Sequence, residues 1–234
     1  MHRVVEPEVL DYLPADDPQA LGSRGDLRRV NALMGHADIL TQAFRENLAP
    51  VFPALRPLRI VDLGAGDGTL LLGLAQLWSA LGVRAEVTLM DRQQVVSDGT
   101  RSACAALGWS VQCLTEDVFT GLERASAPVD VILANLFLHH FKDEPLRALL
   151  QLAAARTALF IACEPRRSSL ALAATCMLGC IGCNAVTRYD AAVSVHAGFE
   201  GRELSALWPA QDGWRLSERN AGMFSHCFTA SREA

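Results

Sequence analysis

Residues 60–68 read Ile60-Val61-Asp62-Leu63-Gly64-Ala65-Gly66-Asp67-Gly68, an apolar strand that runs into a glycine-rich turn. A leucine-rich segment with helical spacing follows, so the order is strand, turn, helix. In an open α/β sheet such a turn lies at the carboxyl end of a parallel strand, where these sheets bind their ligands. Glycines let the backbone approach a ligand closely, and the following helix brings unpaired N–H groups to the same place. We therefore predict a ligand-binding turn at residues 64–68.

The same alternation of strand and helix continues along the chain. Apolar runs predict five strands, at residues 58–63, 86–90, 109–113, 129–134 and 157–163. Two further strands, residues 214–218 and 224–228, flank a turn at residues 220–222. Repeated βα units imply an α/β fold with a doubly wound, mostly parallel sheet, helices on both faces and an antiparallel last strand.

Two segments are expected outside this core. Residues 1–55 read as a helical N-terminal extension, in which Asp26 is placed to cap a helix and prolines at 50, 53 and 57 form a linker. Residues 56–234 form the core, which includes a helical cap segment at residues 165–208. The uncharged run 168–187 within that cap has the length of a membrane span, but its Ala, Gly, Cys and Ser content favours a cap helix.

Composition narrows the class of protein. The chain has 234 residues, half of them apolar, and 21 basic against 26 acidic residues. This balance is typical of a soluble globular enzyme, and the lack of a basic run argues against a nucleic-acid partner. Seven cysteines and an N-terminus without a signal-peptide core predict reduced thiols in the cytoplasm, without stable membrane insertion. The oligomeric state stays open, with a homo-oligomer among the alternatives.

Acidic residues flank the glycine turn. The spacing Gly64-x-Gly66-x-Gly68 differs from the G-x-G-x-x-G of dinucleotide-binding folds, and Asp62 and Asp67 stand on either side. Carboxylates are poorly suited to cradling phosphates and well suited to a ligand with an ammonium or sulfonium group. The turn therefore predicts a cationic ligand.

With these features the chain resembles the small-molecule branch of the class I S-adenosylmethionine-dependent methyltransferases, over residues 58–163 and the terminal strand pair. The resemblance implies a Rossmann-like methyltransferase sheet with S-adenosylmethionine as cofactor. It implies that the turn holds the methionine part, that Asp91 accepts hydrogen bonds from the ribose hydroxyls, and that Asp117 reaches the adenine. The cofactor-binding residues that it implies are Asp62, Gly64, Ala65, Gly66, Asp91, Arg92, Asp117, Val118 and Asn135.

The segment 135–141 also resembles the small-molecule branch, because it lacks the Asn/Asp-Pro-Pro-aromatic motif of nucleic-acid amino methyltransferases. His140 and His139 in this segment are the predicted catalytic residues, since an imidazole can take a proton from a phenol or hydroxyl near neutral pH. The alternative is that the pair packs between strand and helix.

Residues 24–35 resemble, more loosely, methyltransferases that accompany bacterial type III polyketide synthases. This implies a phenolic or quinone-like polyketide acceptor, O-methylation and a place in secondary metabolism; His36 stands where that resemblance would have a polar amide. The predicted substrate residues are Asn31, Met34, His36, Arg166 and His196.

Other functions remain open at this point. One is a non-catalytic binding subunit that kept the cofactor fold; others are C- or N-methylation of another metabolite and a nicotinamide dehydrogenase. Cys176, Cys180 and Cys183 have the C-x₃-C-x₂-C spacing of radical enzymes with an iron–sulfur cluster, but those enzymes carry it on an early loop of a barrel. We expect no metal site.

Overall fold

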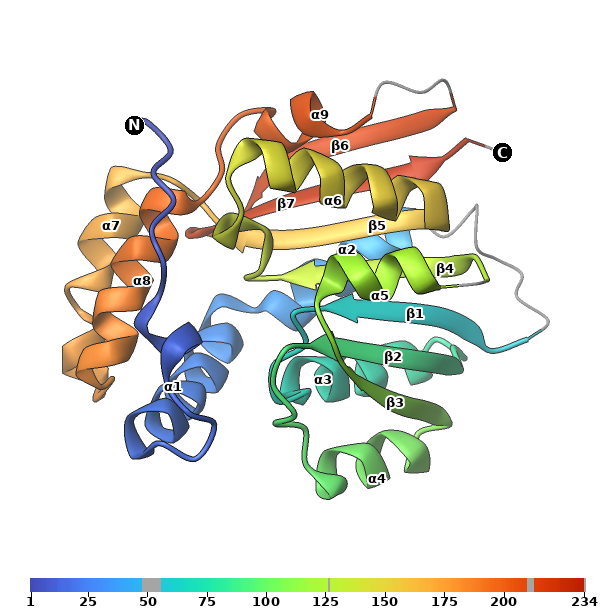
Figure 1. The fold of residues 1–234 in the computed structure, drawn as a ribbon, viewed down its shortest axis with the longest axis horizontal. Coiled ribbons are helices and arrows are strands. Elements are labelled where there is room, and N and C mark those ends of the chain that lie inside the picture. The colour runs from blue at the N-terminus through green and yellow to red at the C-terminus, as the bar shows by residue number, and fades with distance from the viewer. Residues whose placement is uncertain (48–55, 126, 210–212, 234) are drawn as a thin grey trace.

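The computed structural model describes residues 1–47, 56–125, 127–209 and 213–233 (Figure 1). At its centre lies a seven-stranded sheet in the order β3-β2-β1-β4-β5-β7-β6. The strands are β1 (Leu58–Leu63), β2 (Ala85–Asp91), β3 (Trp109–Thr115), β4 (Val129–Asn135), β5 (Thr157–Pro165), β6 (Trp214–Ala221) and β7 (Ser225–Arg232).

The pairing confirms the predicted fold class. Strands β1 to β5 pair in parallel, whereas β7 is antiparallel to both β5 and β6. Leu63 at the end of β1 lies between Met90 of β2 and Ala134 of β4. The carboxyl ends of these three central strands therefore meet at one edge of the sheet.

Helices cover both faces of the sheet. One face carries α2 (His36–Glu46), α3 (Thr69–Ser79) and α4 (Asp98–Ala106), and the other carries α5 (Val118–Arg124), α6 (Asp143–Arg156) and α9 (Glu203–Leu207). On the first face Phe44 stacks on Trp78 with ring centroids 3.7 Å apart, and Trp78 meets Trp109 edge to face. This packing fixes α2 and α3 beside the central strands.

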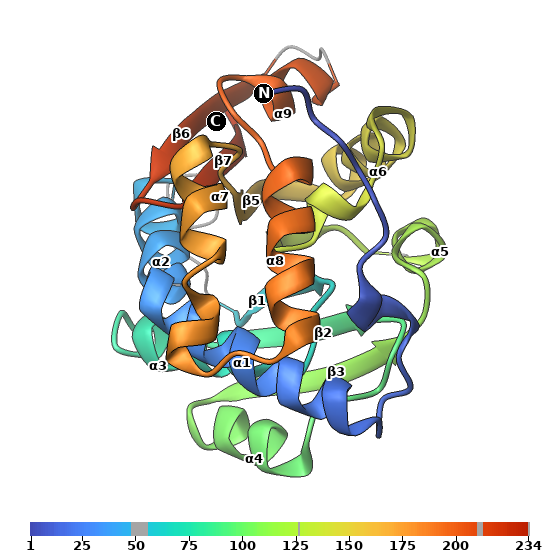
Figure 2. The same ribbon diagram turned by 90° about the vertical axis from the view of Figure 1, so that its left-hand side faces the viewer.

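A helical cap lies over the carboxyl edge of the sheet (Figure 2). It is built from α1 (Pro18–Met34), α7 (Ser169–Thr175), the 3₁₀ turn η3 (Leu178–Ile181) and α8 (Ala185–Ala197). Asp26 joins its two halves, because its carboxylate accepts hydrogen bonds from the Asn184 N–H at 2.7 Å and the Thr187 hydroxyl at 2.9 Å. The cap thus unites segments about 160 residues apart in sequence.

The start of α1 corrects one expectation. Asp26 lies inside α1, and the helix is capped by Asp17, whose side chain accepts from the N–H groups of Gln19 and Ala20. Pro18 stands at the first helical position, which suits a residue without an N–H. Of the expected linker prolines, those at 50 and 53 lie outside the described residues.

A strap formed by residues 1–12 runs beside α8 and includes η1 (Val9–Tyr12) (Figure 2). The Val4 N–H donates to the His196 carbonyl at 3.1 Å, and Arg3 Nε donates to the Ala197 carbonyl at 2.8 Å. The uncharged run 168–187 is divided among α7, η3 and α8. Among the helices of the described ranges, none combines the length and apolar character needed to cross a bilayer.

Candidate active site

The backbone of the glycine turn has positive φ values that residues with side chains rarely adopt. Gly64 has φ +66°, and a Cβ there would lie 2.1 Å from Cδ2 of Phe137. Gly66 has φ +56°, and a Cβ there would meet no atom of the described chain within 4 Å. Thus Phe137 packs directly on one glycine, and open space lies beside the next.

Asp91, at the end of β2, braces the turn. Its Oδ2 accepts from the Gly66 N–H at 2.9 Å, and its Oδ1 accepts from the Gln93 N–H at 2.9 Å. A carboxylate offers about four acceptor positions, so each oxygen retains capacity for another donor. Asp91 can therefore accept hydrogen bonds from two hydroxyl groups of a ligand and still keep its hydrogen bonds to the turn.

Asp62 lies deeper, on β1, and is 4% exposed. Burial, together with the nearby charge of Asp91, raises the pKa of Asp62 to about 7. A cationic group beside it would reverse this effect, since an opposite charge favours the ionised carboxylate. The electrostatics of this end of β1 therefore suit a positively charged ligand.

The next predicted residues lie along the same edge. Asp117 caps α5 by accepting from the Phe119 N–H at 3.0 Å, and Arg92 Nη2 donates to its other oxygen at 2.7 Å. Partial burial alone would raise the pKa of Asp117, but these hydrogen bonds outweigh burial and lower it. Val118, the first residue of α5, is buried behind them.

The cap helix α1 is fastened across the turn. Arg28 Nη1 lies 2.6 Å from Asp67 Oδ2, next to Gly66 and Gly68. Arg24 Nη2 donates to the Gln93 side chain at 2.7 Å, one residue beyond Arg92. These contacts place α1 against the same turn and loop that Asp91 braces.

The loop after β4 is held by a buried carboxylate. Glu164 of β5 is fully buried, and its Oε1 accepts from the N–H groups of Phe137 at 3.0 Å and Leu138 at 2.9 Å. Leu136 has φ +50°, an uncommon value for a residue with a side chain and one that often marks a functional site. The Asn135 Oδ1 atom is buried and has no hydrogen-bond partner within the described part of the chain. The end of β4 thus presents an unsatisfied acceptor on a strained, rigidly held loop.

His139, in the 3₁₀ turn η2 (Leu138–His140), has both ring nitrogens engaged. Its Nδ1 lies 2.8 Å from Glu164 Oε2, and its Nε2 lies 3.2 Å from Glu8 Oε1 in the strap. Burial alone would lower the pKa of His139, but the two carboxylates outweigh burial and raise it to about 9. Two carboxylates thus engage both ring nitrogens of His139 inside the protein, and its catalytic role stays a prediction. His140 is 22% exposed at its side chain, with Nδ1 3.3 Å from Asp11 Oδ2, and its catalytic role stays a prediction.

The predicted substrate residues separate into two groups. His36 begins α2 beside Asn135, and its Nε2 lies 3.1 Å from the Ser225 hydroxyl. Burial lowers the pKa of His36 to about 4, so its ring is neutral at pH 7. Asn31 and Met34 lie in the last turns of α1, just before His36, and Asn31 Oδ1 is buried without a partner within the described ranges.

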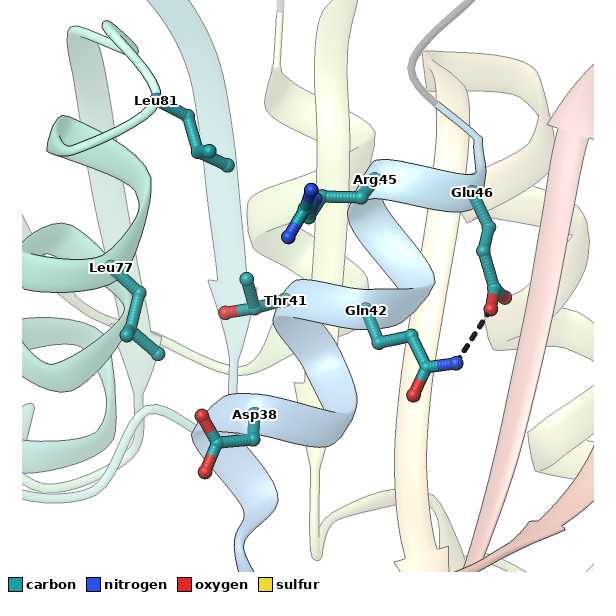
Figure 3. Close-up of a pocket in the computed structure, with 7 residues that line it drawn as sticks. All are labelled: Asp38, Thr41, Gln42, Arg45, Glu46, Leu77 and Leu81. Carbon is teal, nitrogen blue, oxygen red and sulfur yellow. Dashed lines mark hydrogen bonds between the residues drawn. The ribbon is translucent and has the colours of Figure 1, made fainter.

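Arg166 and His196 lie elsewhere on the cap. Arg166 lines a depression of about 350 Å³ shared with Met1, Glu200 and Asn220. The His196 carbonyl accepts the strap hydrogen bond from Val4. Another depression, of about 480 Å³, lies between α2 and α3 (Figure 3) and contains none of the predicted site residues. Its lining includes Leu77 near the end of α3 and Leu81 just after that helix, both far from the glycine turn.

Comparison with known proteins agrees with this geometry. Residues 60–158 match a family model described as a methyltransferase domain. No curated protein sequence matches the chain. A solved structure from Nostoc punctiforme PCC 73102, provisionally described as an O-methyltransferase, is similar with a TM-score of 0.58 and 16% identity over 95% of this chain and 64% of that one.

Two further structures are similar over most of their own length. Magnesium protoporphyrin IX methyltransferase from Synechocystis PCC 6803, solved with S-adenosylmethionine bound, has a TM-score of 0.51 and 15% identity over 94% of this chain and 88% of that one. The plantazolicin methyltransferase BamL, solved with S-adenosylhomocysteine, has a TM-score of 0.55 and 11% identity over 89% and 96%. Residues 60–158 therefore match a methyltransferase domain, and the described chain shares the fold of these solved methyltransferases, as the sequence predicts.

Proposed function

We propose that this chain is an enzyme that transfers the methyl group of S-adenosylmethionine to a hydroxyl group of a small aromatic acceptor. The observation that carries the proposal is the open space beside Gly66, whose N–H donates to Asp91, together with the nearby buried carboxyl of Asp62. A cationic ligand with two vicinal hydroxyls matches these two acids in charge and in hydrogen bonding.

The residues present fit the cofactor. Asp62 would face its positive charge, the turn at residues 64–66 would hold the methionine part, and Asp91 would accept from the ribose hydroxyls. Arg92, Asp117 and Val118 would line the adenine, and Asn135 would lie near the reacting end. The open space beside Gly66, where an added Cβ would meet no atom of the described chain within 4 Å, supports a ligand at this turn.

S-adenosylmethionine supplies an electrophilic methyl group on a sulfonium. The chain's own contribution is positioning and exclusion of water: Glu164 holds the β4 loop rigid, and Arg28 and Arg24 fasten α1 over the turn. Holding an acceptor oxygen in line with the methyl group in such a site can supply much of the acceleration.

The acceptor class rests on two supports. The looser resemblance of residues 24–35 favours a phenolic or quinone-like polyketide. Two similar structures are described provisionally as an O-methyltransferase, from Nostoc punctiforme, and as an O-methyltransferase family protein, from Burkholderia thailandensis.

The proposal also includes a place in secondary metabolism and a cytoplasmic location. The free thiols of the seven cysteines suit such a reducing compartment.

Calorimetry with S-adenosylmethionine, followed by detection of S-adenosylhomocysteine with a panel of phenols, hydroxyquinones, amines and carbon acceptors, tests the proposal. Binding and turnover with phenols are the expected result. Binding without turnover on any acceptor would favour a non-catalytic subunit. Turnover confined to amines or to carbon acceptors would show N- or C-methylation in place of O-methylation.

A further inference from the structure

A second cluster of chemically active side chains lies where the strap meets the β4 loop. One ligand-type atom from each of Glu8, His139 and His140 lies within 4.8 Å of the other two. Glu8 comes from the strap and the histidines from η2, about 130 residues further along the chain. The backbone of both segments is anchored, by Asp190 under η1 and by Glu164 under η2.

The inner histidine is oriented as a metal ligand would be. Its Nδ1 faces Glu164 Oε2 at 2.8 Å, which leaves Nε2 directed at Glu8. A carboxylate behind a histidine is the common arrangement that fixes the tautomer and orientation of a coordinating imidazole. The 3.2 Å from His139 Nε2 to Glu8 Oε1 is close to the ligand–ligand distance of roughly 3.3 Å on a tetrahedral zinc ion.

The charges around the cluster favour a cation. Glu8 and Glu164 flank His139, and Asp11 lies 3.3 Å from His140. Arg3 directs its guanidinium mainly at backbone carbonyls and at Asp143. Three carboxylates thus contact the two imidazoles.

We propose that Glu8, His139 and His140 form a zinc site that fastens the N-terminal strap to the β4 loop. Two imidazoles and a carboxylate form a donor set that binds zinc in preference to magnesium or calcium. Three protein ligands leave a fourth coordination position for water. His139 keeps the proton on Nδ1 for Glu164 and gives up the one on Nε2 to solvent when the ion binds. This departs from the sequence expectation of no metal site, and it gives His140 the role of a ligand in place of a base.

Titration of the full chain, stripped of metal with EDTA and exchanged into a non-chelating buffer, tests the site by calorimetry with zinc chloride. We expect one Zn²⁺ per chain, and binding at least about tenfold weaker for Glu8→Gln and for His140→Gln. His2→Gln is the matched control, because His2 is exposed on the same strap outside the cluster, and it should bind as the parent chain does.

Two further measurements distinguish loss of zinc binding from loss of the fold in the variants. Zinc should raise the Tm of the stripped parent chain, and Glu8→Gln should lose that rise while unfolding cooperatively in EDTA. Cobalt(II) in place of zinc should give the visible absorption of a four-coordinate site in the parent chain. No binding by the parent chain, or equal binding by all variants, would overturn the site and leave a protonated His139 bridging two glutamates. None of these measurements needs S-adenosylmethionine or an acceptor, so they fail independently of the proposed function.

Discussion

Asp91 combines support of the turn with recognition, since it already accepts from Gly66 N–H and retains acceptor capacity toward the open side. We expect Asp91→Ala to weaken binding of S-adenosylmethionine at least about tenfold, because hydrogen bonds to a charged group contribute roughly 1.5–3 kcal/mol. Calorimetry measures this directly. Asp98→Ala removes an exposed acid on α4 and should leave the affinity unchanged; equal affinities for both variants would mean that the end of β2 does not contact the ligand.

Asp62 makes cofactor affinity depend on pH. In the free protein its pKa is raised to about 7, so the carboxyl is mostly protonated at pH 6. A cationic ligand favours the ionised form, so binding releases a proton and affinity rises with pH, by up to about tenfold per unit below pH 7 and little above it. Calorimetry between pH 6 and 8 should show this rise in the parent chain, and Asp62→Asn should bind more weakly and with a flat profile. A flat profile in the parent chain would place the cation away from Asp62.

The residues proposed to bind the cofactor stand out in the sequence because they lie at or near the ends of recognisable strands. The acid-rich turn after β1 and Asp91 after β2 fall at carboxyl ends, which parallel pairing brings to one edge. The carboxylates around His139 could not be predicted in this way. Glu8 lies in a segment without periodic pattern, and its partner is 131 positions away. Glu164 offered one signal, an acid at the end of an otherwise apolar strand.

At the scale of elements, Asp26 links α1 to α8 through hydrogen bonds. It is 4% exposed and accepts from Asn184 and Thr187; its replacement leaves the Asn184 N–H without its partner, whereas the Thr187 hydroxyl keeps Ser23 and the Asn184 side chain. Asp26→Ala should lower the free energy of unfolding by about 1–3 kcal/mol, measured by urea denaturation. Asp38→Ala, at an exposed position in the first turn of α2, is the control and should change it little. An unaltered midpoint in Asp26→Ala would show that packing alone holds the two halves of the cap together.

The strands were predictable because a buried parallel strand is a continuous apolar run, a pattern with few alternative structures. Their observed ends differ from the predicted ends by a few residues. The start of α1 was not. Asp17 and Asp26 are equally good capping residues by type, and the choice between them depends on a contact with α8 that only the folded chain contains. Local propensity therefore located the elements, and tertiary contacts decided where this one begins.

At the scale of the whole molecule, segments from both ends of the chain cover the carboxyl edge of the sheet (Figure 2). Arg3 and Val4 tie the strap to α8, and His36 ties the start of α2 to Ser225 of β7. Under the proposed function, we expect the core to bind the cofactor and the covering segments to select the acceptor.

His36 should make the stability of the whole fold sensitive to mild acid. Burial lowers its native pKa to about 4, against the ordinary value of 6.5 that applies to the unfolded chain. Between these values the unfolded chain binds a proton that the native state excludes, so stability is fully present above pH 6.5 and falls as the pH drops to 4, by up to about 3 kcal/mol. Asp62, whose pKa is raised to about 7, takes up a proton in the native state over the same range and offsets this loss in the parent chain, so the test compares variants. Urea unfolding at pH 6.5 and 4.5 should show the same change in the parent chain and in His2→Gln, whose histidine is exposed. His36→Gln should start less stable, because Ser225 loses a partner, and should gain about 2 kcal/mol relative to the parent chain between pH 6.5 and 4.5. An equal change in His36→Gln and in the parent chain would mean that His36 is protonated at little cost in the native state.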